Sequence, residues 1–377
     1  MQNKLSQKQR WVVKIGSALI TADNTGLNLG NICQWSRQFA ALMHDQVELV
    51  LVSSGSIAAG MHRLNWTERP TALHELQAAA ATGQMGLVQA YESELKSHGI
   101  RTAQVLLTHD DLSHRRRYLN ARSTLATLLQ LGVLPVINEN DTVTTDEIRV
   151  GDNDNLAALV SNLVLADKLI ILTDQDGLYD RDPTKHSNPK LISQAKAGDP
   201  ELLDIARPSH NRFAIGGMRT KIYAAERAAR SGTHTIIASG REPDVLLRLH
   251  RGEQIGTRLE AAQQKWLAHK TWLANQLKAR GKVYVDKGVV EKLKDGACSL
   301  LPVGVTHTEG DFRRGELVLI CASDGTELAR GLVNYSAAEA ALLTGCQSDQ
   351  IKTRLGYVNE PELVNRDNMV AVNVGHH

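Results

Sequence analysis

Two lysines with glycines close by are the residues of this chain best suited to hold a phosphate group. Lys14 is followed by Gly16 and Ser17 after a short apolar run, and Lys221 follows the pair Gly216–Gly217. At a strand end or a helix start, such glycines leave backbone N–H groups open to an anion, and an ammonium neutralises it. Each motif taken alone also fits an ordinary surface turn. The chain has no G-x-x-x-x-G-K-[ST] sequence, which excludes a P-loop.

Serines form a second candidate anion site. Ser53–Ser54–Gly55–Ser56 follows an apolar run and opens a predicted helix at Ile57–Gly60. Its hydroxyl and N–H groups can bind an anion at the edge of a parallel sheet. A serine at a helix start also caps the helix, and the two roles are compatible.

Three polar segments follow or precede apolar runs in the same way. Carboxylates and amides crowd Asn138–Asp141 and Gly151–Asn155, which suits an amino-acid ammonium, a hydrated Mg²⁺ or the orientation of lysines. Thr173–Tyr179 is an Asp/Gly turn at the end of an apolar strand, a position that fits a nucleotide pocket. We interpret the first two segments as functional, because both lie at strand-to-helix edges.

The elements that must position these residues alternate in type over the first ~260 residues, which predicts an α/β fold with a parallel sheet. Several of the strands are apolar almost throughout, as expected for strands covered on both faces. The predicted strands are Trp11–Ile15, Val47–Ser53, Thr102–Leu107, Val133–Asn138, Lys168–Thr173 and Thr233–Ala238. The predicted helices are Leu29–His44, Leu73–Ser97, Arg115–Leu131, Asn155–Ala166 and Met218–Ser231.

The pattern changes near Glu260. Residues 263–280 could form a helix or an irregular linker, and short strands and turns follow from Gly281. Asp324–Gly325 predicts a hairpin turn. We therefore predict a small C-terminal β-barrel of about 80–100 residues.

Composition excludes several classes of protein. The 377 residues carry 43 Lys and Arg against 41 Asp and Glu, and residues 278–377 carry 12 against 13, so neither part is a basic module. This balance, with 4% aromatic residues, argues against nucleic acid as the main partner. No apolar run reaches the ~18 residues of a membrane span, and the N-terminus lacks a signal-peptide pattern. The four cysteines show no C-x-x-C spacing, which favours reduced thiols in a cytosolic protein over a zinc site or a redox motif.

Taken together, the motifs resemble those of the glutamate 5-kinase family. VVKIGSALIT, LVSSGSIAAG, LPVINENDTV, GDNDNLAALV and LTDQDGLYDRDP occur in the order and spacing of that family, and GACSLLPVGVTHTEGDFRRGELVLI resembles a PUA domain. The resemblance covers nearly the whole chain. It implies a three-layer αβα amino-acid-kinase fold over residues 8–262, a linker at 263–280 and a PUA-like domain at 281–373.

The resemblance implies transfer of the ATP γ-phosphoryl group, with Mg²⁺, to the side-chain carboxylate of L-glutamate, the first step of proline biosynthesis. A carboxylate is already ionised at pH 7, so the reaction needs cations and amide donors but no general base. It further implies feedback inhibition by proline, a homo-oligomer (dimer or tetramer) and a cytoplasmic location. The family's catalytic positions match Lys14, Asp154 and Lys221; its glutamate contacts match Ser54, Asp141 and Asn153; its nucleotide contacts match Lys14, Gly16, Thr173, Asp174, Ile215, Gly216, Gly217, Met218, Arg219, Thr220 and Lys221.

One segment departs from the family pattern. The loop before T-K usually reads close to G-T-G-G-M, whereas this chain has Ala214–Ile215 before the two remaining glycines. Ile215 removes a hydroxyl and adds β-branched bulk, and Ala214 is restricted if its position needs a positive φ. We predict weaker or altered nucleotide binding rather than its loss, because Lys221 and both later glycines remain.

Three alternatives stay open at the level of sequence. A kinase of the same fold could act on another acceptor, such as acetylglutamate or aspartate. The PUA-like tail could make the chain an RNA-binding protein, although its net charge of −1 argues against this. An inactive amino-acid sensor would not need Lys14, Asp154 and Lys221, all of which are present.

Overall fold

A computed structural model describes residues 8–22, 26–144, 153–181, 186–205, 217–262, 279–294 and 298–371. The chain divides into two compact units, which are considered separately: Met1–His114 with Asn120–Lys265, and Arg115–Leu119 with Trp266–His377. Most of the predicted linker, residues 263–278, lies outside the described residues. Within the described part of the chain, no helix is both long and apolar enough to span a membrane.

The first unit is built on an eight-stranded sheet with the order β5-β6-β4-β1-β7-β9-β10-β8. All of its pairings are parallel except β9 with β10. The strands are β1 (Arg10–Ile15), β4 (Glu48–Ser53), β5 (Arg101–Leu107), β6 (Val133–Glu139), β7 (Lys168–Thr173), β8 (Gln194–Lys196), β9 (His234–Ser239) and β10 (Thr257–Glu260). The six predicted strands are confirmed as strands of this sheet, and the short β8 and β10 are additions.

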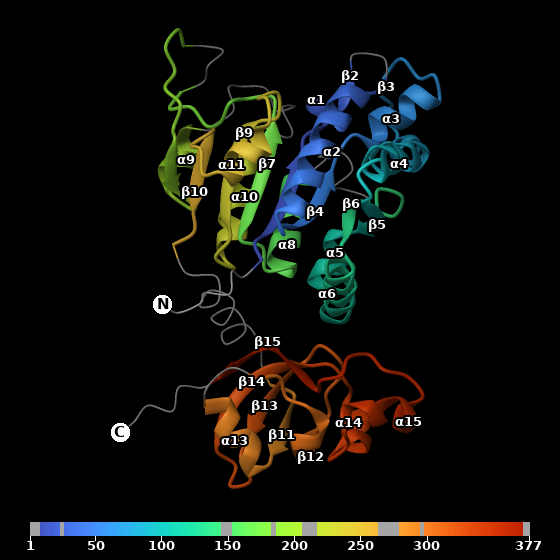
Figure 1. Ribbon diagram of the computed structural model, residues 1–377, viewed down its shortest axis with the longest axis vertical. Coiled ribbons are helices and arrows are strands. Elements are labelled where there is room, and N and C mark those ends of the chain that lie inside the picture. Colours follow the sequence, from blue (N-terminus) through green and yellow to red (C-terminus); the bar gives the residue numbers. More distant parts are fainter. Residues whose placement is uncertain are drawn as a thin grey trace. The chain divides into compact units, whose positions relative to one another are not determined.

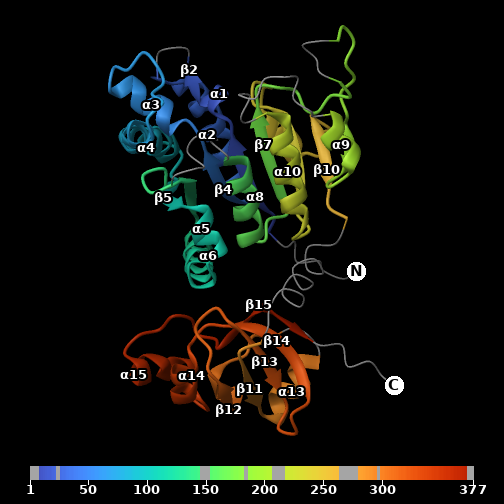
Figure 2. The same ribbon diagram turned by 180° about the vertical axis from the view of Figure 1, so that it is seen from behind.

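Helices cover both faces of the sheet, which confirms the three-layer αβα fold. Helices α2 and α11 lie on the near face in Figure 1, and α8 and α10 lie on the face seen in Figure 2. The helices are α1 (Ser17–Ile20), α2 (Leu29–His44), α3 (Ser56–Arg63), α4 (Leu73–Lys96), α5 (His109–Ser113), α6 (Arg115–Gln130), α8 (Asn153–Leu163), α9 (Pro200–Ile205), α10 (Met218–Ala229) and α11 (Val245–His250). A two-stranded ribbon joins β2 (Thr21–Ala22) to β3 (Gly26–Leu27).

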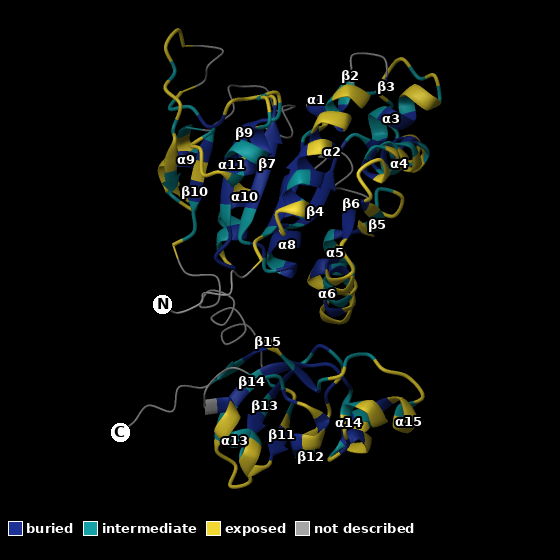
Figure 3. Ribbon diagram, viewed as in Figure 1, coloured by how far each residue is buried: buried dark blue, intermediate teal, exposed yellow. Residues whose placement is uncertain are grey.

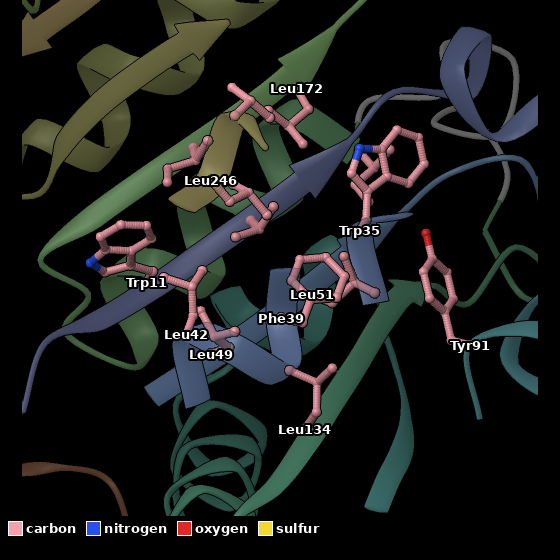
Figure 4. Packing of buried hydrophobic residues seen from close by; sticks show 14 of the residues in the cluster. Trp11, Trp35, Phe39, Leu42, Leu49, Leu51, Tyr91, Leu134, Leu172 and Leu246 are labelled. Atoms are coloured by element: carbon pink, nitrogen blue, oxygen red, sulfur yellow. The ribbon is translucent and has the colours of Figure 1, made fainter. Parts of the chain in front are cut away.

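The core of this unit is mainly aliphatic. Every residue of β6 is buried, as are the last five residues of β1, β4 and β7 (Figure 3). Trp11, Trp35 and Phe39 add the largest side chains to this cluster (Figure 4). Truncating one such buried side chain to alanine costs about 2–5 kcal/mol. The sheet edge that carries the polar segments is therefore supported by a well-packed core.

Two glycines let α3 and α4 approach closely. A Cβ on Gly60 would lie 1.7 Å from the Ala79 carbonyl oxygen, and one on Gly83 would lie 1.9 Å from that of Ser56. Side chains at these positions are therefore excluded without a shift of one helix. The contact fixes the start of α3, which carries the serine segment.

The second unit contains a five-stranded sheet with the order β12-β11-β13-β14-β15, antiparallel except for β11 with β13. The strands are β11 (Gly281–Val285), β12 (Val305–Gly310), β13 (Leu317–Cys321), β14 (Glu327–Val333) and β15 (Val364–Ala371). The predicted hairpin at Asp324–Gly325 is confirmed between β13 and β14, where Gly325 has a φ of 87°. This unit has a separate core that includes Phe312 and Tyr335.

Helices interrupt the run of strands and turns predicted for this unit. They are α13 (Lys287–Lys294), α14 (Ala337–Leu343), α15 (Ile351–Leu355) and two short 3₁₀ turns, η1 (Pro302–Gly304) and η2 (Ser348–Gln350). The Asp286 carboxylate accepts a hydrogen bond from the N–H of Val289 at 2.8 Å and so ends β11 and starts α13. Ser336 and Glu339 form a capping box at the start of α14. That S-x-x-E spacing is visible in the sequence and could have predicted the helix.

Candidate phosphoryl-transfer site

The polar segments meet at the carboxyl end of the sheet. Strands β6, β4, β1 and β7 are neighbours in that order and run parallel. The last one or two residues of these strands, among them Asn138, Ser53, Lys14 and Thr173, therefore lie at one edge. Ligand sites in open α/β sheets form at this edge.

Lys14, Asp154 and Lys221 form a buried cluster at this edge. The Lys14 Nζ lies 2.6 Å from Asp154 Oδ1, and the Lys221 Nζ lies 3.0 Å from Asp154 Oδ2. The three residues are only 5%, 3% and 6% exposed. They come from β1 and from the first turns of α8 and α10, so elements far apart in the sequence form one site.

The charges of this cluster stabilise one another. Burial by itself would raise the pKa of Asp154, but the two ammonium groups and their hydrogen bonds outweigh it and hold that pKa well below its usual range. Asp154 is therefore ionised at neutral pH, and the cluster carries a net charge of +1. This suits the neutralisation of a phosphoryl group without a proton transfer.

The start of α10 is tied to the same carboxylate. The Thr220 hydroxyl lies 2.8 Å from Asp154 Oδ2 and 2.9 Å from the Gly217 carbonyl oxygen. Gly217 is exposed at the N-cap, and Arg219 reaches the Tyr223 hydroxyl at 2.9 Å. Ile215 and Gly216 lie outside the described residues, as do Gly151 and Asp152.

Gly16 follows Lys14 at the start of α1. Its N–H donates to the Leu172 carbonyl oxygen at 3.0 Å, and a Cβ would lie 3.3 Å from that oxygen. The N–H of Gly16 is thus engaged with β7, and phosphate donors would come from the amides that follow it. The glycine itself keeps the first turn of α1 close to β7.

Asn153 links the serine segment to the end of β6. Its Nδ2 donates to the Ser53 carbonyl oxygen at 3.0 Å, the Ser54 Oγ at 3.0 Å and the Asn138 Oδ1 at 2.9 Å. Its Oδ1 is buried and has no hydrogen-bond partner among the described residues. A buried amide oxygen of this kind can accept a hydrogen bond from a ligand ammonium.

Asp141 lies in the turn after β6 and accepts a hydrogen bond from the Ser56 hydroxyl at 3.1 Å. Burial raises its pKa to about 6, against the opposing effects of the Ser56 hydrogen bond and the Arg69 charge. A cavity of about 860 Å³ between α4 and β5 reaches Asp141, but the cluster of Lys14, Asp154 and Lys221 does not line it. The cavity therefore flanks the site on the Asp141 side.

Thr173 and Asp174 close the site at the end of β7. The Thr173 hydroxyl is buried and donates to Asp174 Oδ1 at 3.1 Å, while Asp174 is exposed. This pair offers a carboxylate and a hydroxyl at the outer rim of the edge.

Two further residues hold Asn153 in place, and neither is assigned an individual role by the sequence. Asn138 accepts from Asn153 and donates from Nδ2 to Gln84 Oε1 at 2.6 Å. Asn138 belongs to a polar cluster that the sequence singled out, but Gln84 sits inside a long helix without any distinguishing signal. Together they anchor Asn153 to α4.

Comparisons with known proteins agree with this arrangement. A sequence profile described as the amino acid kinase family matches residues 9–239, and a PUA domain profile matches residues 281–355. The glutamate 5-kinase of Thioalkalivibrio sulfidiphilus is 58% identical over 369 residues, which cover 98% of each chain. Those of Pseudomonas syringae pv. tomato and Nitrosospira multiformis are 58% and 57% identical and cover 99% and 98% of this chain and 100% of their own. The similarity thus extends along both units.

Proposed function

The chain belongs to the amino acid kinase family, and we propose on that premise that it transfers the γ-phosphoryl group of ATP to the side-chain carboxylate of L-glutamate. The product is L-glutamyl 5-phosphate, and its formation is the first step of proline biosynthesis. The observation that carries the proposal is the buried cluster of Lys14, Asp154 and Lys221 beside the amide cluster of Asn153. The relatives that span both units support glutamate as the acceptor.

The chemistry follows from charge. The acceptor carboxylate and the ATP phosphates are both anionic, so the barrier lies in bringing them together and stabilising the charge on the transferring group. Lys14 and Lys221 approach from two sides of that group, and Asp154 keeps both ammoniums in place without accepting a proton. Each positioned cation of this kind is worth roughly 10²–10³ in rate.

For the acceptor, we assign Ser54, Asp141 and Asn153 to glutamate. The ionised Asp141 and the free Oδ1 of Asn153 suit the α-ammonium, and the Ser54 hydroxyl suits a carboxylate oxygen. An ammonium beside Asp141 lowers the pKa of its carboxyl, so substrate binding and ionisation are coupled.

For the nucleotide, we assign contacts to Gly16, Thr173, Asp174 and residues 215–221, together with Lys14. Mg²⁺ enters with ATP and supplies neutralisation of the phosphate charge. No group of three or more His, Cys, Asp or Glu in the described residues is arranged to hold a metal, and Asp154 is taken up by two lysines. Phosphate oxygens and water would then provide most of the ligands of the ion, which Mg²⁺ tolerates well.

Three further features belong to the proposal and rest on the resemblance of the motifs to the family. We expect inhibition by proline, assembly into a dimer or tetramer, and a cytoplasmic location. We also propose domain limits of 8–262 and 281–373, joined by residues 263–280. Light scattering coupled to size exclusion, and turnover with added proline, test the first two.

A coupled ADP-release assay across acceptors tests the proposed function. L-Glutamate should support turnover, whereas N-acetylglutamate and L-aspartate should support little. Preference for another acceptor would overturn the assignment of glutamate as substrate but would leave the proposed phosphoryl-transfer site unaffected. Unchanged ADP release by Lys221→Ala would contradict the site itself.

A further inference from the structure

A second cavity, of about 140 Å³, lies at the opposite end of the sheet, where β7 and β9 begin. Leu249 of α11 and the turn of residues 252–256 cover it. Lys168, His234 and Arg258 all line it. None of these three residues belongs to the phosphoryl-transfer site, which lies at the carboxyl ends of the strands.

Strand register places the three cationic side chains on one face of the sheet. Lys168 on β7 pairs with His234 on β9. Two residues along β9, Ile236 pairs with Arg258 on β10. Because side chains alternate between faces and paired residues share a face, all three project toward the face covered by α11.

Carboxylates compensate the charge on this face only in part, because Asp167 acts on Lys168 and His234, and Glu260 acts on His234 and Arg258. Lys168 Nζ sits 4.5 Å from the ring centroid of Trp11, and among residues that the structure describes Lys168 makes no ion pair. Arg258 lies 3.4 Å from Glu260. Glu253 also lines the cavity, but Arg248 binds it at 2.7 Å.

The pKa values of Lys168 and His234 reflect this incomplete compensation of charge. Burial first, and then repulsion by Arg258, lowers the pKa of Lys168 and that of His234 below their ordinary values. Lys168 is a half-buried cation, and His234 is a half-buried group that becomes a cation on protonation. Nearby carboxylates compensate these charges only in part. An anion in the cavity would reverse both effects.

We propose that this cavity binds a small oxyanion of the size and charge of inorganic phosphate. A volume of 140 Å³ corresponds to about four or five water molecules, enough for one tetrahedral oxyanion. It is too small for a nucleotide, whose pockets measure about 300 Å³ or more. Lys168 and Arg258 would donate to the oxyanion directly. His234 accepts a hydrogen bond at Nδ1 from the Ala261 N–H at 3.3 Å, which leaves Nε2–H to donate to the oxyanion, and protonation of the ring would add a positive charge.

Equilibrium dialysis of radiolabelled phosphate against the full chain tests the site. A saturating non-hydrolysable ATP analogue with Mg²⁺ blocks the phosphoryl-transfer site. We expect about one phosphate per chain, and we expect Lys168→Gln to weaken binding by about tenfold or more. Lys96→Gln removes an equal charge at an exposed position of α4 and should leave phosphate binding unchanged.

The pH dependence gives a second readout. The charges that reach His234 are those of Arg258, Glu260, Lys168 and Asp167, and none of these four groups has an ordinary pKa near neutral pH. The pKa of His234 is lowered in the empty cavity, and a bound anion would raise it again. Phosphate affinity should therefore be higher at pH 6 than at pH 8, beyond the change due to phosphate itself, and His234→Gln should remove the excess. The matched inorganic anion sulfate, which stays doubly charged over this range, isolates the contribution of the protein.

The proposal fails if phosphate does not bind once the ATP analogue is present, or if Lys168→Gln and Lys96→Gln bind it equally. Retained binding of the ATP analogue shows that each variant is folded. Should Lys168→Gln not fold, Arg258→Gln at an exposed position gives the same test: loss of phosphate binding supports the site, and unchanged binding overturns it.

Discussion

The two ends of the central sheet both gather cationic side chains, but they handle the charge in opposite ways. At the carboxyl end, Asp154 lies between Lys14 and Lys221 and contacts both within 3.0 Å. At the amino end, Lys168 and His234 are paired by strand register and, among the residues that the structure describes, no carboxylate forms an ion pair with either; their pKa values are lowered despite the nearby Asp167. A carboxylate between two lysines keeps both charged before any ligand arrives. A cluster without one depends on its ligand and on pH.

Removing Asp154 should have the largest effect. Asp154→Asn removes the carboxylate that contacts both buried ammonium groups, and we expect the free energy of unfolding to fall by about 3–5 kcal/mol, with loss of turnover. Urea denaturation and ADP release measure the two effects. Asp176→Asn, at an exposed position after β7, should change stability by less than ~0.5 kcal/mol. Equal stability of the two variants would show that Asp154 does not balance the lysines.

Lys221→Met should separate catalysis from stability. It leaves the contact between Lys14 and Asp154 intact, so the loss of stability should be smaller than for Asp154→Asn. We expect kcat to fall by about 10²–10³ because one cation at the transferring phosphoryl group is lost. Lys196→Met, on the exposed edge strand β8, is the matched control for kcat. A change confined to KM would assign Lys221 to ground-state binding instead.

The stability of the chain should depend on pH through Asp141 at the carboxyl end of the sheet. The pKa of Asp141 is raised to about 6, above its unfolded value near 3.9, so its protonated form stabilises the fold and that contribution is lost as pH rises. Between pH 5 and 7 this loss amounts to about 1–1.5 kcal/mol. Asp141→Asn should remove this decline in urea denaturation measured across that range.

Ligand affinities sharpen the same contrast. Glutamate affinity at the carboxyl end should rise from pH 5 to 7, because an ammonium prefers ionised Asp141, whereas phosphate affinity at the amino end should fall as His234 loses its proton. Calorimetric titration of glutamate at the two pH values measures the first effect. Glutamate affinity that is flat with pH in the wild-type chain would separate Asp141 from the ammonium.

The smallest effect is expected from Ile215→Thr in the glycine loop. Restoring a hydroxyl where phosphate should approach adds one hydrogen bond of about 0.5–1.5 kcal/mol, which lowers the KM for ATP by about two- to tenfold. Initial rates at varied ATP measure this change. An unchanged KM would show that the departure from the family pattern has no consequence for nucleotide binding.

The fold of the first unit could be predicted because its strands are almost wholly apolar and its helices are long. Helix α2 matches the predicted bounds, and the starts of α4, α6 and α10 match as well. The order of the strands could not be predicted, because parallel pairing leaves no local signal in the sequence. The short strands β8 and β10 could not be predicted either, because three or four residues are too few to show a pattern and these strands are defined by pairing with their neighbours.

The site could be predicted only in part. Lys14, Asp154 and Lys221 stand in recognisable motifs, and the structure brings their side chains together. Gln84 could not be found, because its importance comes from the Asn138 contact across the fold. The amino-end cluster was invisible as well, since Lys168 and His234 are 66 residues apart and meet only through strand register.

Trapping of the product with hydroxylamine tests the central claim most directly. The full chain is incubated with ATP, Mg²⁺ and L-glutamate, and an acyl phosphate is converted to its hydroxamate as it forms. We predict stoichiometric release of ADP and γ-glutamyl hydroxamate, both abolished in Asp154→Asn and reduced by about 10²–10³ in Lys221→Met. ADP release without hydroxamate, or hydroxamate formation unaffected by Lys221→Met, would contradict the account.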